Sequence, residues 1–143
     1  MTLNLLTCIE NGSDQSLSQA TDDHGDDDAN GDDAGHVRIY ENISGSWSQV
    51  GQDIDGEAAY DYSGHSVSVS LDGSIIAIGA KENDGNGSGS GHVRVYENVG
   101  GSWSQVGQDI DGENSEDNSG SVSLNSDGSI VAIGAYTNNG IQE

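Results

Sequence analysis

Acidic side chains in two matching loops are the residues of this sequence whose types and spacing suggest chemistry. They are Asp53, Asp55, Glu57 and Asp61 in the first loop, and Asp109, Asp111, Glu113 and Asp117 in the second. Spaced carboxylates are the ligands that a hard cation such as Ca²⁺ takes in proteins. Neither loop has the ligand spacing of an EF-hand, so we expect solvated loop charge with weak, nonspecific divalent-cation binding at most.

The sequence gives little support to catalysis. His36 and His92 occupy the same position of two repeated stretches, which indicates a structural role, and His24 lies in an acidic tail. A Gly-x-Ser-x-Gly elbow, a phosphate-cradling loop and a zinc-spaced histidine pair are all missing from the sequence. Asp53 and Asp55 resemble a glycosidase carboxylate pair only superficially, because alternate residues at a strand end do not oppose each other across a substrate. We expect no enzyme, with a carbohydrate-active enzyme as the remote alternative.

The net charge of the chain limits the classes of partner that it can bind. The 143 residues include 25 acidic and 3 basic ones, for a net charge of -22. Such a chain repels nucleic acid and anionic membrane surfaces and attracts cations. Cys8 is the single cysteine, so no internal disulfide can form. The opening MTLNLLTCIE lacks the basic residue and cleavage signature of a signal peptide, and we expect no membrane insertion.

Two similar hairpins must position these loops. From Ser66 to Ala80 the sequence reads SVSVSLDGSIIAIGA, with apolar residues alternating with serines before an Asp72-Gly73 turn and an unbroken apolar run after it. This pattern predicts a β-hairpin whose turn glycine has a positive φ angle. The hairpin returns as SVSLNSDGSIVAIGA from Ser121 to Ala135.

A longer repeat contains each hairpin. GHVRIYENISGSWSQVGQDIDGE begins at Gly35 and returns as GHVRVYENVGGSWSQVGQDIDGE at Gly91, an offset of 91 − 35 = 56 residues. The first copy predicts a strand over 36–42, a second strand from Trp47 to about Ile54, an acidic loop and then the hairpin. The repeat therefore predicts an all-β protein with four strands in each unit.

The repeat also divides the chain. We expect residues 1–24 to be disordered, because they show no period and are polar. Residues 25–34 align with the loop before Gly91, so we interpret them as the closing loop of an earlier repeat. Residues 35–90 and 91–143 are then two tandem repeats. Asp26, Asp28, Asn30 and Asp32, with their sparser copy Asn83, Asp84 and Asn86, form a second acidic loop that we also interpret as solvated charge.

The hairpin resembles a known repeat. SGHSVSVSLDGSIIAIGA is similar to the FG-GAP repeat of integrin-α-type β-propellers, although Ser63 and Ser119 replace its Phe, and Lys81 and Tyr136 replace its Pro. The resemblance implies tandem four-stranded antiparallel blades of a β-propeller, here an incomplete pair. The Ca²⁺ loop of that family would fall at the tight Asp72-Gly73 turn, so we expect that site not to be inherited. Kelch repeats are the alternative by period.

The resemblance implies a function as well. We expect a non-catalytic binding or adhesion module that is a fragment of a longer repeat array, with other blades or copies of itself, a protein or a glycan as partners. A truncated product with no independent function is the alternative. The resemblance implies an extracellular or cell-surface location. We interpret Trp47, Trp103, Tyr40 and Tyr96 as core and inter-blade packing rather than as a ligand surface.

Overall fold

The computed structural model describes residues 5–10, 30–138 and 140 of the chain. The described residues form eleven strands and no helix, and every pair of neighbouring strands in the sheets is antiparallel. The prediction of an all-β fold is therefore confirmed. No helix in the described part of the chain is long and apolar enough to cross a membrane.

The first sheet is built around β2. Its strands are β1 (Leu5–Glu10), β2 (His36–Ile43), β3 (Ser46–Gln49) and β4 (Ile54–Asp55). β3 and β4 both pair with β2, β3 along its C-terminal half and β4 at its N-terminal end. The single strand predicted from Trp47 to Ile54 is thus divided, and the backbone between the two parts stays attached because Val50 N donates to Ile39 O at 2.8 Å.

β1 supplies the outer edge of this sheet. The sequence predicts disorder over 1–24, but Leu5–Glu10 is instead a strand that pairs with all but the last two residues of β2. An unpaired strand edge offers backbone donors and acceptors to any extended segment, so pairing does not need a hydrophobic period in the segment that pairs. The rest of the predicted disordered range lies outside the described residues.

The middle sheet takes its strands from both sequence repeats. Its strands are β5 (Ser63–Val69), β6 (Ile75–Ala80), β7 (His92–Val99), β8 (Ser102–Gln105) and β9 (Ile110–Asp111). β6 of the first repeat pairs with β7 of the second, so the strand order β5-β6-β7-β8 crosses the repeat boundary between residues 90 and 91. β9 also pairs with β7. The third sheet is the hairpin of β10 (Ser119–Leu124) and β11 (Val131–Ala135).

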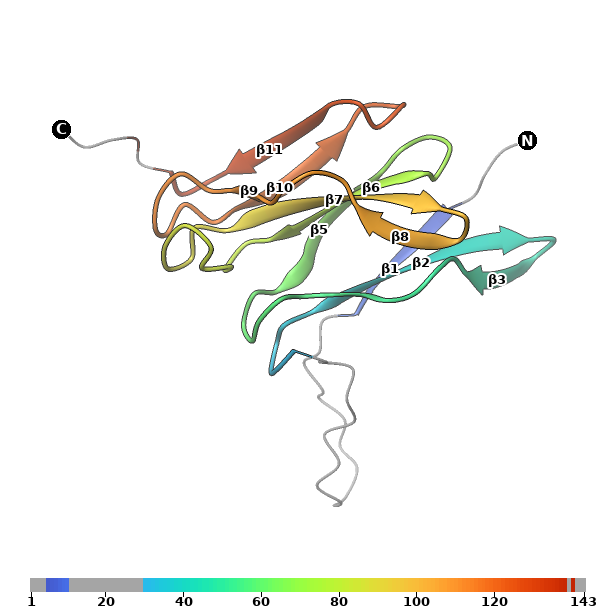
Figure 1. Cartoon of the computed structure of the whole chain (residues 1–143), viewed down its shortest axis with the longest axis horizontal. Helices are drawn as coiled ribbons and strands as arrows, with labels where there is room; N and C mark the ends of the chain where they lie inside the picture. Colours follow the sequence, from blue (N-terminus) through green and yellow to red (C-terminus); the bar gives the residue numbers. More distant parts are fainter. Residues whose placement is uncertain (1–4, 11–29, 139, 141–143) are drawn as a thin grey trace, which may run out of the picture.

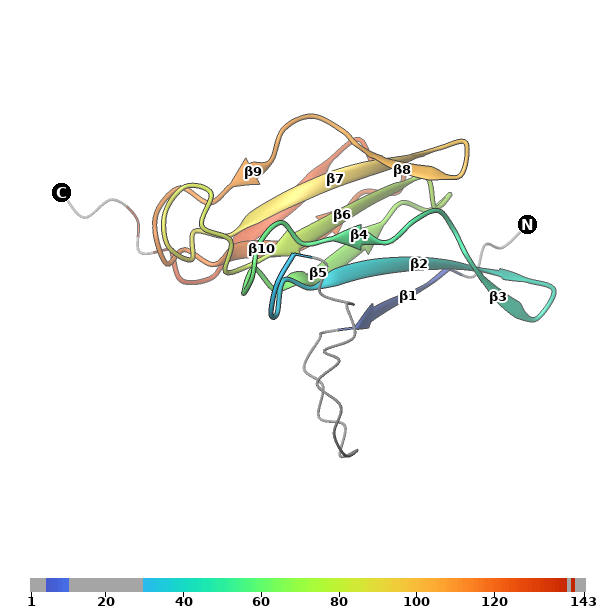
Figure 2. The ribbon, with the colours of Figure 1, turned by 60° about the horizontal axis from the view of Figure 1, so that its bottom comes forward.

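The three sheets form layers, with the middle sheet between the other two (Figure 1, Figure 2). The alternation of β6 shows which face meets which neighbour. Ile76 and Ile78 join a core with the first sheet, whereas Gly79 faces the third sheet, next to Gly120. The unbroken apolar run predicted for this strand is therefore explained by burial on both faces.

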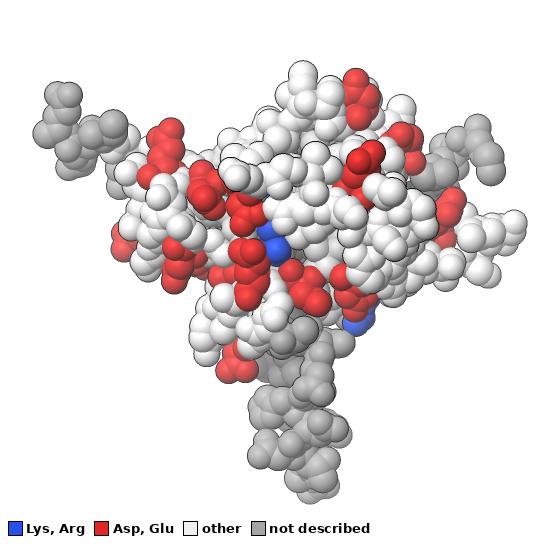
Figure 3. All heavy atoms as spheres, in the orientation of Figure 1, with Lys and Arg blue, Asp and Glu red and all other residues white. Residues whose placement is uncertain are grey.

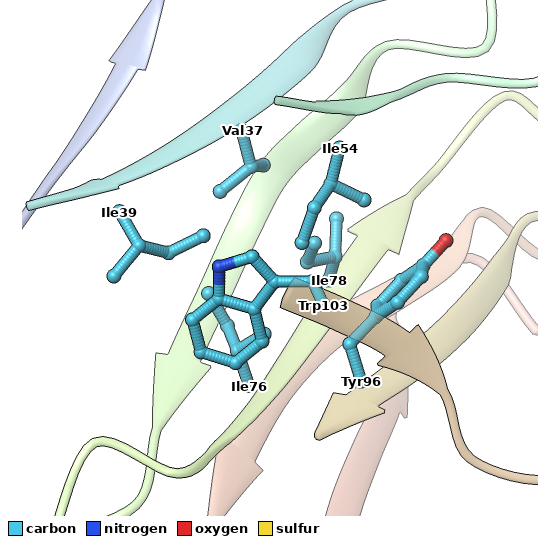
Figure 4. Close-up of a cluster of buried hydrophobic side chains, with 7 residues drawn as sticks. All are labelled: Val37, Ile39, Ile54, Ile76, Ile78, Tyr96 and Trp103. Atoms are coloured by element: carbon cyan, nitrogen blue, oxygen red, sulfur yellow. The ribbon is translucent and has the colours of Figure 1, made fainter. Parts of the chain in front are cut away.

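The core between the first and middle sheets centres on Trp103 (Figure 4). Its indole lies among side chains of both sheets, and Nε1 donates to Val50 O at 2.7 Å. Because a buried indole N–H needs an acceptor, this hydrogen bond fixes Trp103 against the first sheet. The cluster consists of Val37, Ile39, Ile54, Ile76, Ile78, Tyr96 and Trp103.

The middle and third sheets meet at a close backbone approach. A Cβ atom added at Gly79 would overlap the carbonyl oxygen of Gly120. Further along the same contact, Val122 N and Leu124 N donate to the hydroxyls of Ser66 and Ser68, at 3.1 and 2.9 Å. The two sheets therefore lie too close together for any side chain at Gly79.

We predict that Gly79→Ala lowers the free energy of unfolding by about 1–3 kcal/mol, because the methyl group forces β6 away from β10. Gly134→Ala is the matched control, since Gly134 is the equivalent residue of the second hairpin and its added Cβ would meet only Ser121 Cβ at 3.5 Å. Urea unfolding of both variants checks this. Equal effects of the two substitutions would contradict the close approach.

The turn of the first hairpin uses both residues of the Asp72-Gly73 pair. Gly73 has φ +75° and its equivalent Gly128 has φ +73°, which confirms the predicted positive angles. Asp72 has a role that the sequence did not indicate, because its Oδ1 accepts hydrogen bonds from Ser74 N at 3.0 Å and from the Ser70 and Ser74 hydroxyls at 2.7 Å. These donors, the Ser74 amide first, lower the pKa of Asp72 from 3.8 to about 2.

We predict that the Asp72 carboxyl group titrates near pH 2 in the folded protein when followed by NMR. A lowered pKa means that ionised Asp72 stabilises the folded state fully above pH 3.8, and that this contribution is lost as the pH falls toward 2. The difference in unfolding midpoint between the wild type and Asp72→Asn should therefore shrink over that pH range. Titration of Asp72 near the ordinary aspartate pKa of 3.8 would show that the turn does not stabilise the carboxylate.

Candidate functional site

Charged side chains of the two repeats meet where the loop after β4 passes β7. Arg94, in β7 and 7% exposed, donates from Nη2 to the backbone oxygen of Asp55 at 2.9 Å. Its Nη1 lies 3.5 Å from Glu57 Oε1. Arg94 thus ties the acidic loop of the first repeat to a strand of the second.

Next to this contact, two carboxylates approach one buried imidazole. His92 Nδ1 lies 3.8 Å from Glu57 Oε2 and 3.9 Å from Asp109 Oδ2. The His92 side chain is 1% exposed, and its Nδ1 has no hydrogen-bond partner among the described residues. One donor atom from each of the three residues lies within 4.8 Å of the others, so together they can hold a metal ion. We call these three residues the junction cluster.

The second oxygen of each carboxylate in the junction cluster is already held. Asp109 Oδ1 accepts a hydrogen bond from Gln105 Nε2 at 2.6 Å, and Glu57 Oε1 faces Arg94. The oxygens Asp109 Oδ2 and Glu57 Oε2 are then the ones that face His92. A donor behind each carboxylate is the arrangement that orients metal ligands in proteins.

The electrostatics keep the imidazole of His92 neutral. Burial lowers the pKa of His92 below its usual 6.5, and the Arg94 guanidinium lowers it further. The carboxylates of Asp109, Glu57 and Asp61 oppose this shift without reversing it. Near neutral pH the imidazole therefore carries a lone pair, as a ligand to a metal must.

The same positions of the first repeat are arranged differently. There Arg38 Nε donates to Asp53 Oδ2 at 2.9 Å, and Gln49 Nε2 donates to Asp53 Oδ1 at 2.6 Å. Burial raises the pKa of Asp53, but these two hydrogen bonds, together with the charges of Arg38 and His36, outweigh burial and lower it overall. The arginine of the first repeat thus pairs with its own aspartate, whereas Arg94 turns to the preceding repeat and leaves Asp109 Oδ2 facing His92.

The remaining metal candidates of the sequence are not members of the junction cluster. Asp61 and Asp117 are buried, and Oδ2 of each accepts a loop amide and an asparagine side chain: Ala58 N and Asn83 for Asp61, Asn114 N and Asn138 for Asp117. These two carboxylates hold loops in place. Asp111 and Glu113 are exposed, and Asp55 contributes its backbone oxygen to Arg94.

The other acidic loop has a structural role in its described part. Asn30 Nδ2 donates to Gly56 O at 2.6 Å, and the equivalent Asn86 Nδ2 donates to Gly112 O at 2.9 Å. Each asparagine therefore attaches its loop to the loop after β4 or β9. Asp26 and Asp28 lie outside the described residues.

Sequence reasoning missed His92 and Arg94 as site residues. The repetition of His92 as His36 indicated a structural role only, and no role was assigned to Arg94 from the sequence. The signal that could have found them is their position at the start of a strand, next to repeated acidic loops in a chain with only 3 basic residues.

Comparison with known proteins assigns no family to the chain. No protein-family model matches the sequence, and no curated protein is similar to it.

We predict that Arg94→Met lowers the free energy of unfolding by about 1–3 kcal/mol, because the hydrogen bond to Asp55 O is lost within the sheet junction. Lys81→Met is the charge-matched control. Lys81 lies 3.8 Å from its chain neighbour Glu82, a partly exposed pair whose loss should cost about 0–1 kcal/mol. Thermal unfolding in 0.15 M salt compares the two variants, and a larger loss for Lys81→Met would contradict the role of Arg94.

Proposed function

We propose that this protein is a non-catalytic binding module of the β-propeller type, whose repeats stack face to face and whose partners include further copies of the same repeat. The contact of Trp103 with the first sheet carries this proposal. It is a contact between two repeats, and the residues on both of its sides occur twice in the chain.

The contact has two complementary sides. On one side Trp103 inserts its indole, and its backbone N and O form hydrogen bonds with the side chain of Gln52 at 3.0 and 2.8 Å. On the other side Val50, Gln52 and Ile54 receive it. We call these the tryptophan side and the receiving side.

A second copy of each side is exposed. Trp47 is equivalent to Trp103 but is 47% exposed, against 4% for Trp103. Val106 and Ile110 are equivalent to Val50 and Ile54, and they are 47% and 42% exposed, against 4% for Ile54. The molecule therefore presents an exposed tryptophan side on the first sheet and an exposed receiving side on the middle sheet.

The glycines of the receiving sides agree with this interpretation. A Cβ added at Gly51 would lie 2.7 Å from Trp103 Cδ1, whereas one added at Gly107 would meet nothing within 4 Å. Space is thus present at Gly107 where a tryptophan fills it at Gly51. A head-to-tail contact that uses different surfaces on its two sides can repeat, and it closes into a ring when the rotation allows. Stacking of this kind is how propeller blades bury their faces.

The charge of the surface favours a cationic ligand over an anionic one. Acidic side chains are spread over the face in Figure 3, and basic ones are visible at two places only. A surface of this sign attracts cationic groups of a protein partner and repels anions at low ionic strength.

The experiment inserts a second copy of residues 35–90 between Ala34 and Gly35, so that Trp47 of the original repeat acquires a receiving side. In the natural chain, Trp103→Ala should cost about 3–5 kcal/mol of unfolding free energy, because a buried tryptophan is lost. Trp47→Ala should change it by only about 0.5 kcal/mol, as for an exposed residue. In the extended chain, the original Trp47→Ala should become as costly as Trp103→Ala.

Chemical denaturation of the natural chain, its Trp103→Ala and Trp47→Ala variants, the extended chain and its Trp47→Ala variant gives the result. A Trp47→Ala effect that stays small in the extended chain would refute the stacking of repeats. The extended chain should also unfold at a higher denaturant concentration, since each added repeat adds an interface. An unchanged midpoint would contradict the proposal in the same way.

A further inference from the structure

We propose that the junction cluster of Glu57, His92 and Asp109 is a binding site for one divalent transition-metal ion of the zinc class. The site goes beyond the proposed function, because it concerns a ligand held between two repeats rather than the contact of the repeats themselves.

The unpartnered nitrogen of His92 is the observation that distinguishes this cluster from ordinary surface acid. A buried polar atom without a hydrogen bond destabilises the fold, so most such atoms have a partner. His92 Nδ1 is buried, and the nearest carboxylate oxygens are too far for a direct hydrogen bond at 3.8 and 3.9 Å. An ion between the three groups would satisfy all of them at once.

The distances suit an ion after a small movement. Two ligands at about 2.0 Å from a tetrahedral zinc ion lie about 3.3 Å apart. The carboxylates of Glu57 and Asp109 are 44% and 30% exposed, so their side chains can close the remaining distance toward the fixed imidazole. Water would take the remaining coordination positions.

The donor set selects the class of ion. One imidazole nitrogen with two carboxylates suits Zn²⁺ and its neighbours among the transition metals, whereas Ca²⁺ and Mg²⁺ prefer oxygen ligands alone. Arg94 and Gln105 hold the far oxygens of Glu57 and Asp109, so the near oxygens keep their direction. The Arg94 charge reduces the negative field of Glu57 and therefore limits the affinity.

Stacking of the repeats creates the site. Glu57 comes from the loop of one repeat, while His92 and Asp109 come from the next repeat. Glu113 is the equivalent of Glu57 in the second repeat; it is exposed and is not part of the cluster. The chain therefore provides a control carboxylate of the same repeat position outside the site.

The experiment titrates the whole chain with Zn²⁺ alone in 0.15 M NaCl and millimolar Mg²⁺, which suppresses diffuse binding to the acidic surface. Isothermal titration should show one saturable site per chain. Glu57→Gln and Asp109→Asn should each weaken it at least tenfold, as loss of a ligand or of its support does. Glu113→Gln and the exposed-histidine control His65→Gln should leave it unchanged.

Circular dichroism checks the folding of Glu57→Gln and Asp109→Asn separately. Because both substitutions change partly exposed residues, the spectra should match that of the wild type. Zn²⁺ should then raise the melting temperature of the wild type and of Glu113→Gln but not that of Glu57→Gln. Equal affinity of all four variants, or uptake that does not saturate, would overturn the site. An equal rise with Ca²⁺ that is lost in Glu57→Gln would show an oxygen site without His92, and would also overturn the proposal.

Discussion

The burial of one sheet against the next is the interaction on which the rest of this structure depends. β6 is apolar on both faces, so the middle sheet is stable only with the first sheet over Ile76 and Ile78 and the third sheet next to Gly79. Trp103 fixes the distance and direction of the first contact through its hydrogen bond to Val50. In a chain of repeats, stability is approximately a sum of unit and interface terms, so the contact between the sheets contributes to the stability of both repeats.

The same packing brings the charged residues together. His92, Arg94 and Tyr96 alternate along β7. The strand that contributes Tyr96 to the core therefore also places His92 and Arg94 next to the acidic loop of the preceding repeat. Arg94 contacts the loop of the preceding repeat, whereas Arg38 pairs with Asp53 of its own repeat. The junction cluster is therefore a consequence of stacking and not of either repeat alone.

Much of the local structure could be predicted from the sequence, and the relation between repeats could not. The Asp72-Gly73 hairpin follows from alternation and turn chemistry, which are properties of neighbouring residues. The pairing of β6 with β7 does not, because a tandem repeat has the same sequence whichever residue is taken as the start of a unit. Strand β1 was missed because backbone pairing needs no side-chain pattern. Glu57 and His92 belong to different repeats, and only the packing of sheets brings them together.

Repulsion between acidic loops opposes the stacking of further repeats. Each added repeat places another acidic loop beside the previous one, and a net charge of -22 shows that the three basic residues do not balance those loops. Two of the three, Arg38 and Arg94, lie at the repeat position next to the loops, where each contacts a carboxylate. Dissolved salt lowers the repulsion between carboxylates at every exposed loop, because ionic screening does not require a particular arrangement of ligands. An ion held by Glu57, His92 and Asp109 would act at one junction, and would link the two repeats that provide its ligands.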